Sequence, residues 1–132
     1  ENEISRDEMR LLYSISDAFV LPTRGEGWGL PAMEAMAMEV PPIITNYSGP
    51  STFVTSENGY LVRVARIHRN GQAEPDLDHV KEHMKFVYSH RDHARRQGKR
   101  ARADVLEKYH PDKVAESILQ HIESALFLKL EQ

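Results

Sequence analysis

The sequence contains no cysteine, and this absence excludes several kinds of site. There can be no disulfide framework, no thiolate metal site and no cysteine nucleophile. A chain without cysteine fits a reducing compartment, and we expect a cytoplasmic location. Long apolar runs are also missing, since none approaches the ~20 residues that a membrane-spanning helix needs. No N-terminal apolar segment resembles a signal peptide, so we expect no transmembrane segment.

The residues that are present are typical of one globular unit. The chain has 132 residues, of which 40% are hydrophobic and 28% are charged. Its formal net charge of -3 is unevenly divided, because residues 1–60 carry three basic and nine acidic groups. Basic groups are in excess in residues 61–132. The first residue is Glu1 and not Met, and we therefore expect residues 1–132 to be one part of a longer protein.

Short apolar runs that alternate with helical patterns predict an α/β fold. Ser5–Glu8 has the S-x-x-E spacing of a capping box, which predicts a helix that ends at Asp17. A second helix is predicted to begin near Leu30-Pro31. Alternation of strand and helix indicates a small parallel sheet with right-handed crossovers. Three runs are predicted strands, the first of them buried on both faces: 18–21, 43–45 and 60–64.

The second half of the chain is predicted to be mostly helical. Residues 65–75 are polar and irregular, and we expect a surface loop or small insertion there. Apolar stripes then predict three helices, the last entered through Pro111. The expected division is an α/β part over residues 1–64, which carries the site, and a helical tail over residues 76–130. Doubly wound sheets usually have more strands, which we expect to lie before Glu1.

A glycine-rich loop between the first predicted strand and the second helix is the candidate site. Gly25, Gly27 and Gly29 let backbone approach a ligand, at the strand end where open parallel sheets bind ligands. The free N–H groups and positive dipole of the following helix favour an anion such as phosphate. Glu26 and Glu34 offer carboxylate oxygens, which accept hydrogen bonds from vicinal sugar hydroxyls. Together these features indicate a nucleotide sugar.

The same segment carries a motif with a specific resemblance. The sequence Glu-Gly-Trp-Gly-Leu-Pro-Ala-Met-Glu-Ala-Met-Ala over residues 26–37 follows the pattern E-G-F-G-L-P-x-x-E-A-M-A. It resembles the E-x7-E signature of GT-B retaining glycosyltransferases of family four, with Trp28 in place of the usual Phe. Residues 46–54 and 57–62 are similar to the segments that follow in that family.

The resemblance implies a fold and a reaction. The fold class is α/β, a partial Rossmann-like domain equivalent to the latter part of a GT-B C-terminal domain. Such an enzyme moves a hexose from a nucleotide-diphosphate sugar to an acceptor with retention, without a metal or a cofactor. The implied partners are the nucleotide sugar and an N-terminal acceptor domain.

The resemblance also implies roles for single residues. Glu34 matches the acid that binds the donor ribose hydroxyls. Glu26 matches the acid near the transferred sugar, and it is both a donor-binding and the catalytic candidate. The segment whose N–H groups meet donor oxygens is matched by four further residues: Gly27, Trp28, Gly29 and Leu30.

Three departures from the family pattern stand out. Met38-Glu39 replaces a small residue and glycine, which predicts a strained or altered turn. Ser51-Thr52 stands where a glutamate is frequent. The basic pair that neutralises the leaving diphosphate lies earlier in the family's domain and has no counterpart here. We therefore expect the isolated chain to be inactive.

Two other functions compete with glycosyl transfer. Glu26 and Glu34 could form the acid/base pair of a glycoside hydrolase, although eight residues of helix would separate them by about 12 Å. A basic run over residues 91–102 could form a non-catalytic interaction module. No aromatic residues interleave with it, so a solvated helix face is favoured and no nucleic-acid partner is expected.

The remaining candidate residues have simpler interpretations. The histidine pairs His79/His83 and His90/His93 have the spacing of zinc ligands on a helix, but no third ligand is obvious. We expect solvated helix histidines and no metal site. Trp28 is equally compatible with core packing and with lining the donor pocket. The methionines of the second helix are predicted to fill the core.

Overall fold

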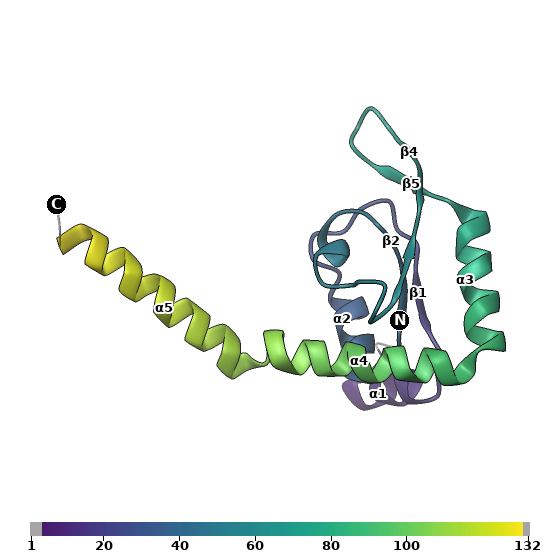
Figure 1. The fold of residues 1–132 in the computed structure, drawn as a ribbon, viewed down its shortest axis with the longest axis horizontal. Coiled ribbons are helices and arrows are strands. Elements are labelled where there is room, and N and C mark those ends of the chain that lie inside the picture. Colours follow the sequence, from purple (N-terminus) through teal and green to yellow (C-terminus); the bar gives the residue numbers. More distant parts are fainter. Residues whose placement is uncertain (1–3, 131–132) are drawn as a thin grey trace.

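The computed structural model describes residues 4–130 and shows an α/β fold. Figure 1 shows its elements in chain order. They are α1 (Arg6–Ser14), β1 (Phe19–Leu21), α2 (Leu30–Ala37), β2 (Pro42–Thr45), the 3-10 helix η1 (Gly49–Thr52), β3 (Tyr60–Val62), β4 (Val64–Ile67), β5 (Ala73–Pro75), α3 (Leu77–Ser89), α4 (Arg91–Tyr109) and α5 (Pro111–Leu130).

The predicted parallel sheet is confirmed. Its strand order is β1-β2-β3, with both neighbouring pairs parallel and Ile43 in register with Val20 and Tyr60. The central strand β2 is buried along its whole length. Ile44 packs in a core with α2 and α4, whereas Ile43 packs in a core with α3. The sheet therefore has helices on both faces, as in a partial Rossmann-like domain.

The first strand is less buried than the sequence predicts. Val20 is 37% exposed, so the expectation of a strand buried on both faces is wrong. β1 lies at one edge of the described sheet. On the face that Val20 shares with Ile43, α3 packs against β2 and β3. Val20 is left lining a shallow hollow beside Met84 and Tyr88.

Helix α1 forms as its capping box predicts, but it is shorter. The Ser5 hydroxyl accepts the N–H of Glu8, and the Glu8 carboxylate accepts the backbone N–H of Ser5. The helix ends at Ser14 and not at Asp17. Serine hydroxyls compete for the last backbone carbonyls, since Ser14 and Ser16 donate to the carbonyls of Leu11 and Leu12.

An antiparallel hairpin replaces the irregular loop expected over residues 65–75. β4 and β5 pair with Arg66 opposite Glu74, and these side chains form an ion pair of 3.0 Å. The turn contains Gly71 with a φ of 81°, in the left-handed region that glycine adopts readily. The hairpin projects from the end of the sheet (Figure 1). The third strand correspondingly ends at Val62 and not at Val64.

The three predicted helices of the second half are confirmed as α3, α4 and α5. α4 crosses the base of the sheet domain, and α5 extends away from it (Figure 1).

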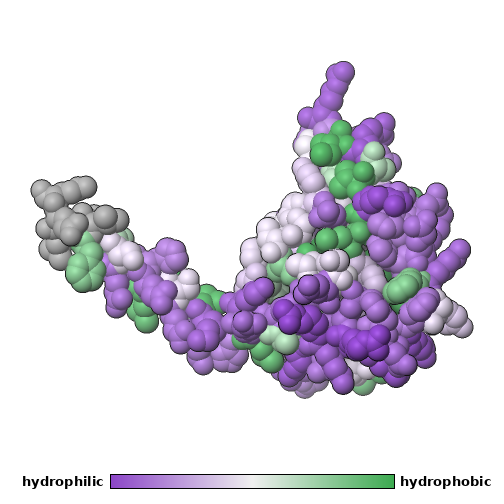
Figure 2. Space-filling view, viewed as in Figure 1, coloured by the Kyte–Doolittle hydropathy of each residue, from purple (hydrophilic) through white to green (hydrophobic). Residues whose placement is uncertain are grey.

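Figure 2 shows apolar residues among polar ones along α5. Within residues 4–130, no helix combines the length and apolar character needed to cross a bilayer. The exposed apolar side chains of α5 include Val114, Ile118, Leu119, Ile122, Leu126 and Phe127.

Candidate functional site

The glycine-rich loop over residues 23–29 follows β1 directly, at its carboxyl end, as predicted. The last residue of β2 and the segment after it anchor this loop. The Thr45 hydroxyl donates to the carbonyl of Thr23 at 2.7 Å, and the N–H of Glu26 donates to the Ser48 hydroxyl at 2.9 Å. The carbonyl of Glu26 accepts the N–H of Gly49 at 3.3 Å. These bonds fix the backbone of the loop before any ligand is present.

The glycines of the loop have two different roles. Gly29 has a φ of 87°, and a Cβ there would lie 2.5 Å from the Cγ of Pro50. A Cβ on Gly49 would lie 2.2 Å from the carbonyl oxygen of Gly27. Both positions require glycine: Gly29 because of its left-handed φ and the ring of Pro50, and Gly49 because it packs on the backbone of Gly27. By contrast, a Cβ on Gly25 or Gly27 would meet open space, and these two positions leave room for a ligand.

The start of α2 is accessible. Gly29 is its N-cap, without a side-chain cap, and its carbonyl accepts the N–H groups of Ala32 and Met33. Among the hydrogen bonds of residues 4–130, none has the N–H of Gly27, Trp28 or Leu30 as donor. These three residues are exposed, whereas Gly29 is buried. The chain's own core therefore does not block the helix start, and donors remain for an anion.

Glu34 lies in α2, just beyond the helix start. The first turn of α2 holds no acidic residue, and Glu34 is its fifth residue. Its carboxylate oxygen Oε2 lies 3.3 Å from the hydroxyl of Tyr13 on α1. Glu34 also lines a groove of about 550 Å³ that α1, α2 and α4 enclose. The side chain is exposed, so its second oxygen is available to a ligand.

Glu26 lies in the glycine-rich loop itself. It is half-buried, and Ser48 and Gly49 hold its backbone. Within the described part of the chain its carboxylate takes part in none of the ion pairs. The loop after β2 thus contacts Glu26, while α1 contacts Glu34. Both acids belong to the loop–α2 unit, one before the helix start and one after it.

Trp28 both packs and faces solvent. Its ring lies 5.4 Å from that of Phe53 and 5.9 Å from that of Tyr109, measured between centroids. It remains 41% exposed. The two interpretations of Trp28 therefore do not exclude each other, because an aromatic side chain can anchor the loop with one side and present the other.

The family departures have visible consequences. Glu39 ends the turn after α2 with a φ of 63°, which bears out the strain, though not an alteration, predicted for the turn at Met38-Glu39. A non-glycine residue is strained in this region. Ser51 and Thr52 lie in η1, where their hydroxyls donate to the carbonyls of Ser48 and Gly49 at 2.7 Å each. They cap the turn that supports the glycine loop.

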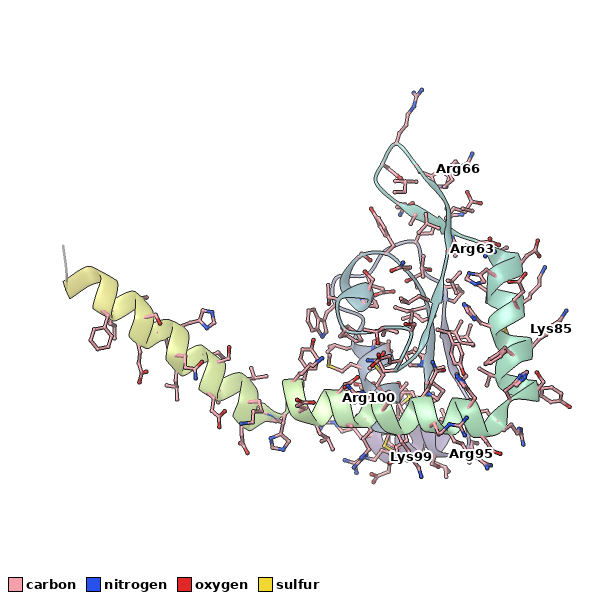
Figure 3. All side chains as sticks on the ribbon, in the orientation of Figure 1. Arg63, Arg66, Lys85, Arg95, Lys99 and Arg100 are labelled. Carbon is pink, nitrogen blue, oxygen red and sulfur yellow. The ribbon has the colours of Figure 1, made fainter. Side chains whose placement is uncertain are left out.

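The basic run of α4 is largely paired with nearby acids. Arg91 lies 2.8 Å from Asp17, and Arg100 lies 3.1 Å from Asp104. Arg95 lies 3.6 Å from Asp92 one turn earlier. Figure 3 shows Arg95, Lys99 and Arg100 along α4, with Lys85 on α3. Local pairing of this kind favours the solvated helix face predicted from the sequence.

The histidines of α3 and α4 are packed more closely than predicted. His79 and His83 have ring centroids 4.2 Å apart, and His83 lies 5.4 Å from Tyr60. His93 packs against Phe86, with centroids 5.3 Å apart. Burial lowers the pKa of His83. In the part of the chain that the structure describes, no group of three or more His, Cys, Asp or Glu residues could hold a metal ion.

Two residues that support the site, Tyr13 and Ser48, are not predicted from the sequence. Both act through contacts with residues 21 or 22 positions away in the chain. The turn residues after the second strand only weakly indicate that Ser48 could support the loop. Nothing in the sequence indicates that the hydroxyl of Tyr13 contacts Glu34.

Comparisons of the sequence with known proteins identify its family. Residues 2–104 match the family described as glycosyl transferases group 1. Over 51 residues the chain is 45% identical to the capsular polysaccharide biosynthesis glycosyltransferase CapM of Staphylococcus aureus, which is 38% of this chain. Over 45 residues it is 42% identical to the O-antigen chain mannosyltransferase RfbU of Salmonella typhimurium, which is 34% of this chain. Each alignment spans 13% of the relative's length. The family match covers most of the chain, which therefore belongs to the glycosyl transferases group 1 family.

Proposed function

We propose that this chain is the donor-binding part of a retaining glycosyltransferase of the GT-B type. It would bind a nucleotide-diphosphate sugar, from which a hexose passes to an acceptor. One observation carries the proposal: the open start of α2 follows the carboxyl end of a parallel strand, with Glu26 before it in the chain and Glu34 after it. Family membership supports sugar transfer over the hydrolytic use of the same two acids.

The backbone of the loop supplies the anion-binding groups. The N–H groups of Gly27, Trp28 and Leu30 would meet phosphate or sugar oxygens, since they have no partner among the described residues. The positive end of the α2 dipole would stabilise the charge that grows on the leaving diphosphate. The exposed side of Trp28 would line the donor pocket.

The two acids would recognise hydroxyl groups. Glu34 would accept hydrogen bonds from the ribose hydroxyls with the oxygen that faces away from Tyr13. Glu26 would contact hydroxyls of the transferred sugar and is the catalytic candidate. Charge-assisted hydrogen bonds of this kind are stronger than neutral ones, and they select sugars that carry vicinal hydroxyls.

The proposal includes further parts of a longer enzyme. An N-terminal acceptor domain and the basic groups for the diphosphate would complete the active site, and the isolated chain would be inactive. The names of the two relatives refer to capsular polysaccharide biosynthesis and to the O-antigen chain. A polysaccharide precursor is therefore the acceptor class to test first.

Calorimetry of the full-length enzyme tests the proposal. A panel of nucleotide sugars, including UDP-glucose, GDP-mannose and UDP-N-acetylglucosamine, should contain one that binds well above the others. Glu34→Ala should weaken its binding by about 10- to 100-fold, the worth of hydrogen bonds to a charged group. Glu57→Ala is the matched control, because Glu57 is exposed and distant in sequence from the loop. Binding undiminished by Glu34→Ala would contradict the ribose role.

A further inference from the structure

Tyr13 is a core residue whose hydroxyl reaches out of the core. It is 7% exposed and packs with Ala35 and Val40. Its ring also meets the edge of Phe19, with centroids 5.9 Å apart. A phenylalanine would satisfy all of these apolar contacts. The hydroxyl therefore has to be explained separately.

The hydroxyl of Tyr13 contacts α2 close to the start of that helix. It is 3.3 Å from the Oε2 atom of Glu34 and 3.3 Å from the carbonyl oxygen of Pro31. Both distances are long for O–H···O bonds, as expected of one proton shared between two acceptors. Burial raises the pKa of Tyr13, and the negative charge of Glu34 raises it further. The phenol thus stays protonated and remains a donor.

No charged group competes with Tyr13 for Glu34 within residues 4–130. Three arginines line the same groove as Glu34. Arg10 pairs instead with Asp7, and Arg102 donates to the carbonyl of Ala37 and lies 4.0 Å from Glu39. Arg6 is not among the ion-pair partners of any described acid. The phenol is therefore the direct side-chain donor to Glu34.

We propose that Tyr13 is the positioning residue for Glu34, an inference that rests on the proposed function. The phenol holds Oε2 toward α1, which directs Oε1 toward the ribose hydroxyls of the donor. An exposed glutamate otherwise samples several rotamers, and ordering it costs free energy when the ligand binds. Pre-ordering by Tyr13 removes part of that cost. Ribose binding would also tighten the long phenol–carboxylate contact.

A double-mutant cycle on the full-length enzyme tests this role. The variants are Tyr13→Phe, Glu34→Ala and the double substitution, and the probes are UDP and GDP with their dideoxyribose counterparts. Tyr13→Phe should weaken binding of the preferred ribonucleotide by about three- to tenfold, the worth of one neutral hydrogen bond or slightly more. It should have no effect on the dideoxy probe, and none in the Glu34→Ala background.

A matched variant separates this role from a loss of stability. Tyr60→Phe removes another hydroxyl from a core tyrosine, one that lies 3.4 Å from His93, and should leave nucleotide affinity unchanged. Urea unfolding of Tyr13→Phe checks that the variant is folded. Equal weakening of the ribose and dideoxy probes would overturn the positioning role. So would an unchanged affinity of Tyr13→Phe when Glu34→Ala weakens binding, although the donor-site proposal would then stand. Unchanged affinity in Glu34→Ala would defeat both.

Discussion

Gly98 of α4 allows that helix to pack directly on the turn that ends α2. A Cβ at this position would lie 1.9 Å from the carbonyl oxygen of Glu39 and 2.8 Å from its carbonyl carbon. It would also lie 3.2 Å from the Cδ of Pro41. The obstacle is backbone and cannot rotate away. In Gly98→Ala, α4 and the turn must therefore move apart by more than about 1 Å to reach an ordinary contact.

Gly98→Ala should lower the free energy of unfolding, whereas the same substitution in an exposed helix raises it. Replacing glycine by alanine inside an exposed helix stabilises it by about 1 kcal/mol. Overpacking a tight contact costs about 1–3 kcal/mol and occasionally more. The overpacking cost at Gly98 should lie at the upper end of this range, because α4 packs against α2 through the fully buried Ala101 and Ala32. We expect Gly98→Ala to lower the free energy of unfolding by about 2 kcal/mol.

Urea unfolding followed by circular dichroism measures this change. Ala103→Gly is the control, since Ala103 is an exposed interior residue of the same helix. Ala103→Gly should lower the free energy of unfolding by about 1 kcal/mol, which measures the effect of helix propensity alone in α4. A Gly98→Ala variant that is as stable as the parent chain, or more stable, would refute the close approach of α4 to Glu39.

Two further predictions concern buried polar groups. Asn58 is 1% exposed and bonds to the N–H of Thr55, the carbonyl of Phe53 and the carboxylate of Asp104. Asn58→Ala should therefore cost about 2–4 kcal/mol in urea unfolding, and a cost below about 1 kcal/mol would contradict this network. Burial lowers the pKa of His83 from its ordinary 6.5, so the unfolded chain binds this proton more readily than the folded one. Stability should fall as the pH drops through about 6.5, and His83→Gln should reduce the slope of thermal-unfolding midpoints against pH.

The parts of the fold that the sequence predicts correctly depend on local rules. The capping box at Ser5–Glu8 starts α1 as expected, and Gly29 followed by Leu30-Pro31 starts α2. Each signal involves residues within four positions of one another. The parallel pairing of β1 and β2 follows from the α2 crossover between them. These features therefore do not depend on long-range packing.

The features that were missed depend on contacts distant in the sequence. The β4–β5 hairpin is short and carries charged residues: Arg66 pairs with Glu74 across it, and the N–H of Ala73 bonds to the distant carbonyl of Arg24. The exposure of Val20 depends on how far α3 extends over the sheet. Neither property can be inferred from the residues of one element alone.

The candidate site divides in the same way. The identities of Glu26 and Glu34, and the open glycine loop, were predicted from the spacing and the motif. Their supports were not, because Tyr13 contacts α2 and Ser48 contacts the glycine loop only once the chain has folded. His83 was misjudged for the same reason, since its packing against Tyr60 is a property of the α3–β3 contact.

The central claim is that backbone amides at the start of α2 bind the donor. Amide NMR of the full-length enzyme, titrated with its preferred nucleoside diphosphate, tests this claim most directly. The N–H signals of Gly27, Trp28 and Leu30 should shift most, and they should saturate together with binding. If the nucleotide saturates the enzyme while these three amides keep their positions and other regions respond, the assignment of the donor site is wrong.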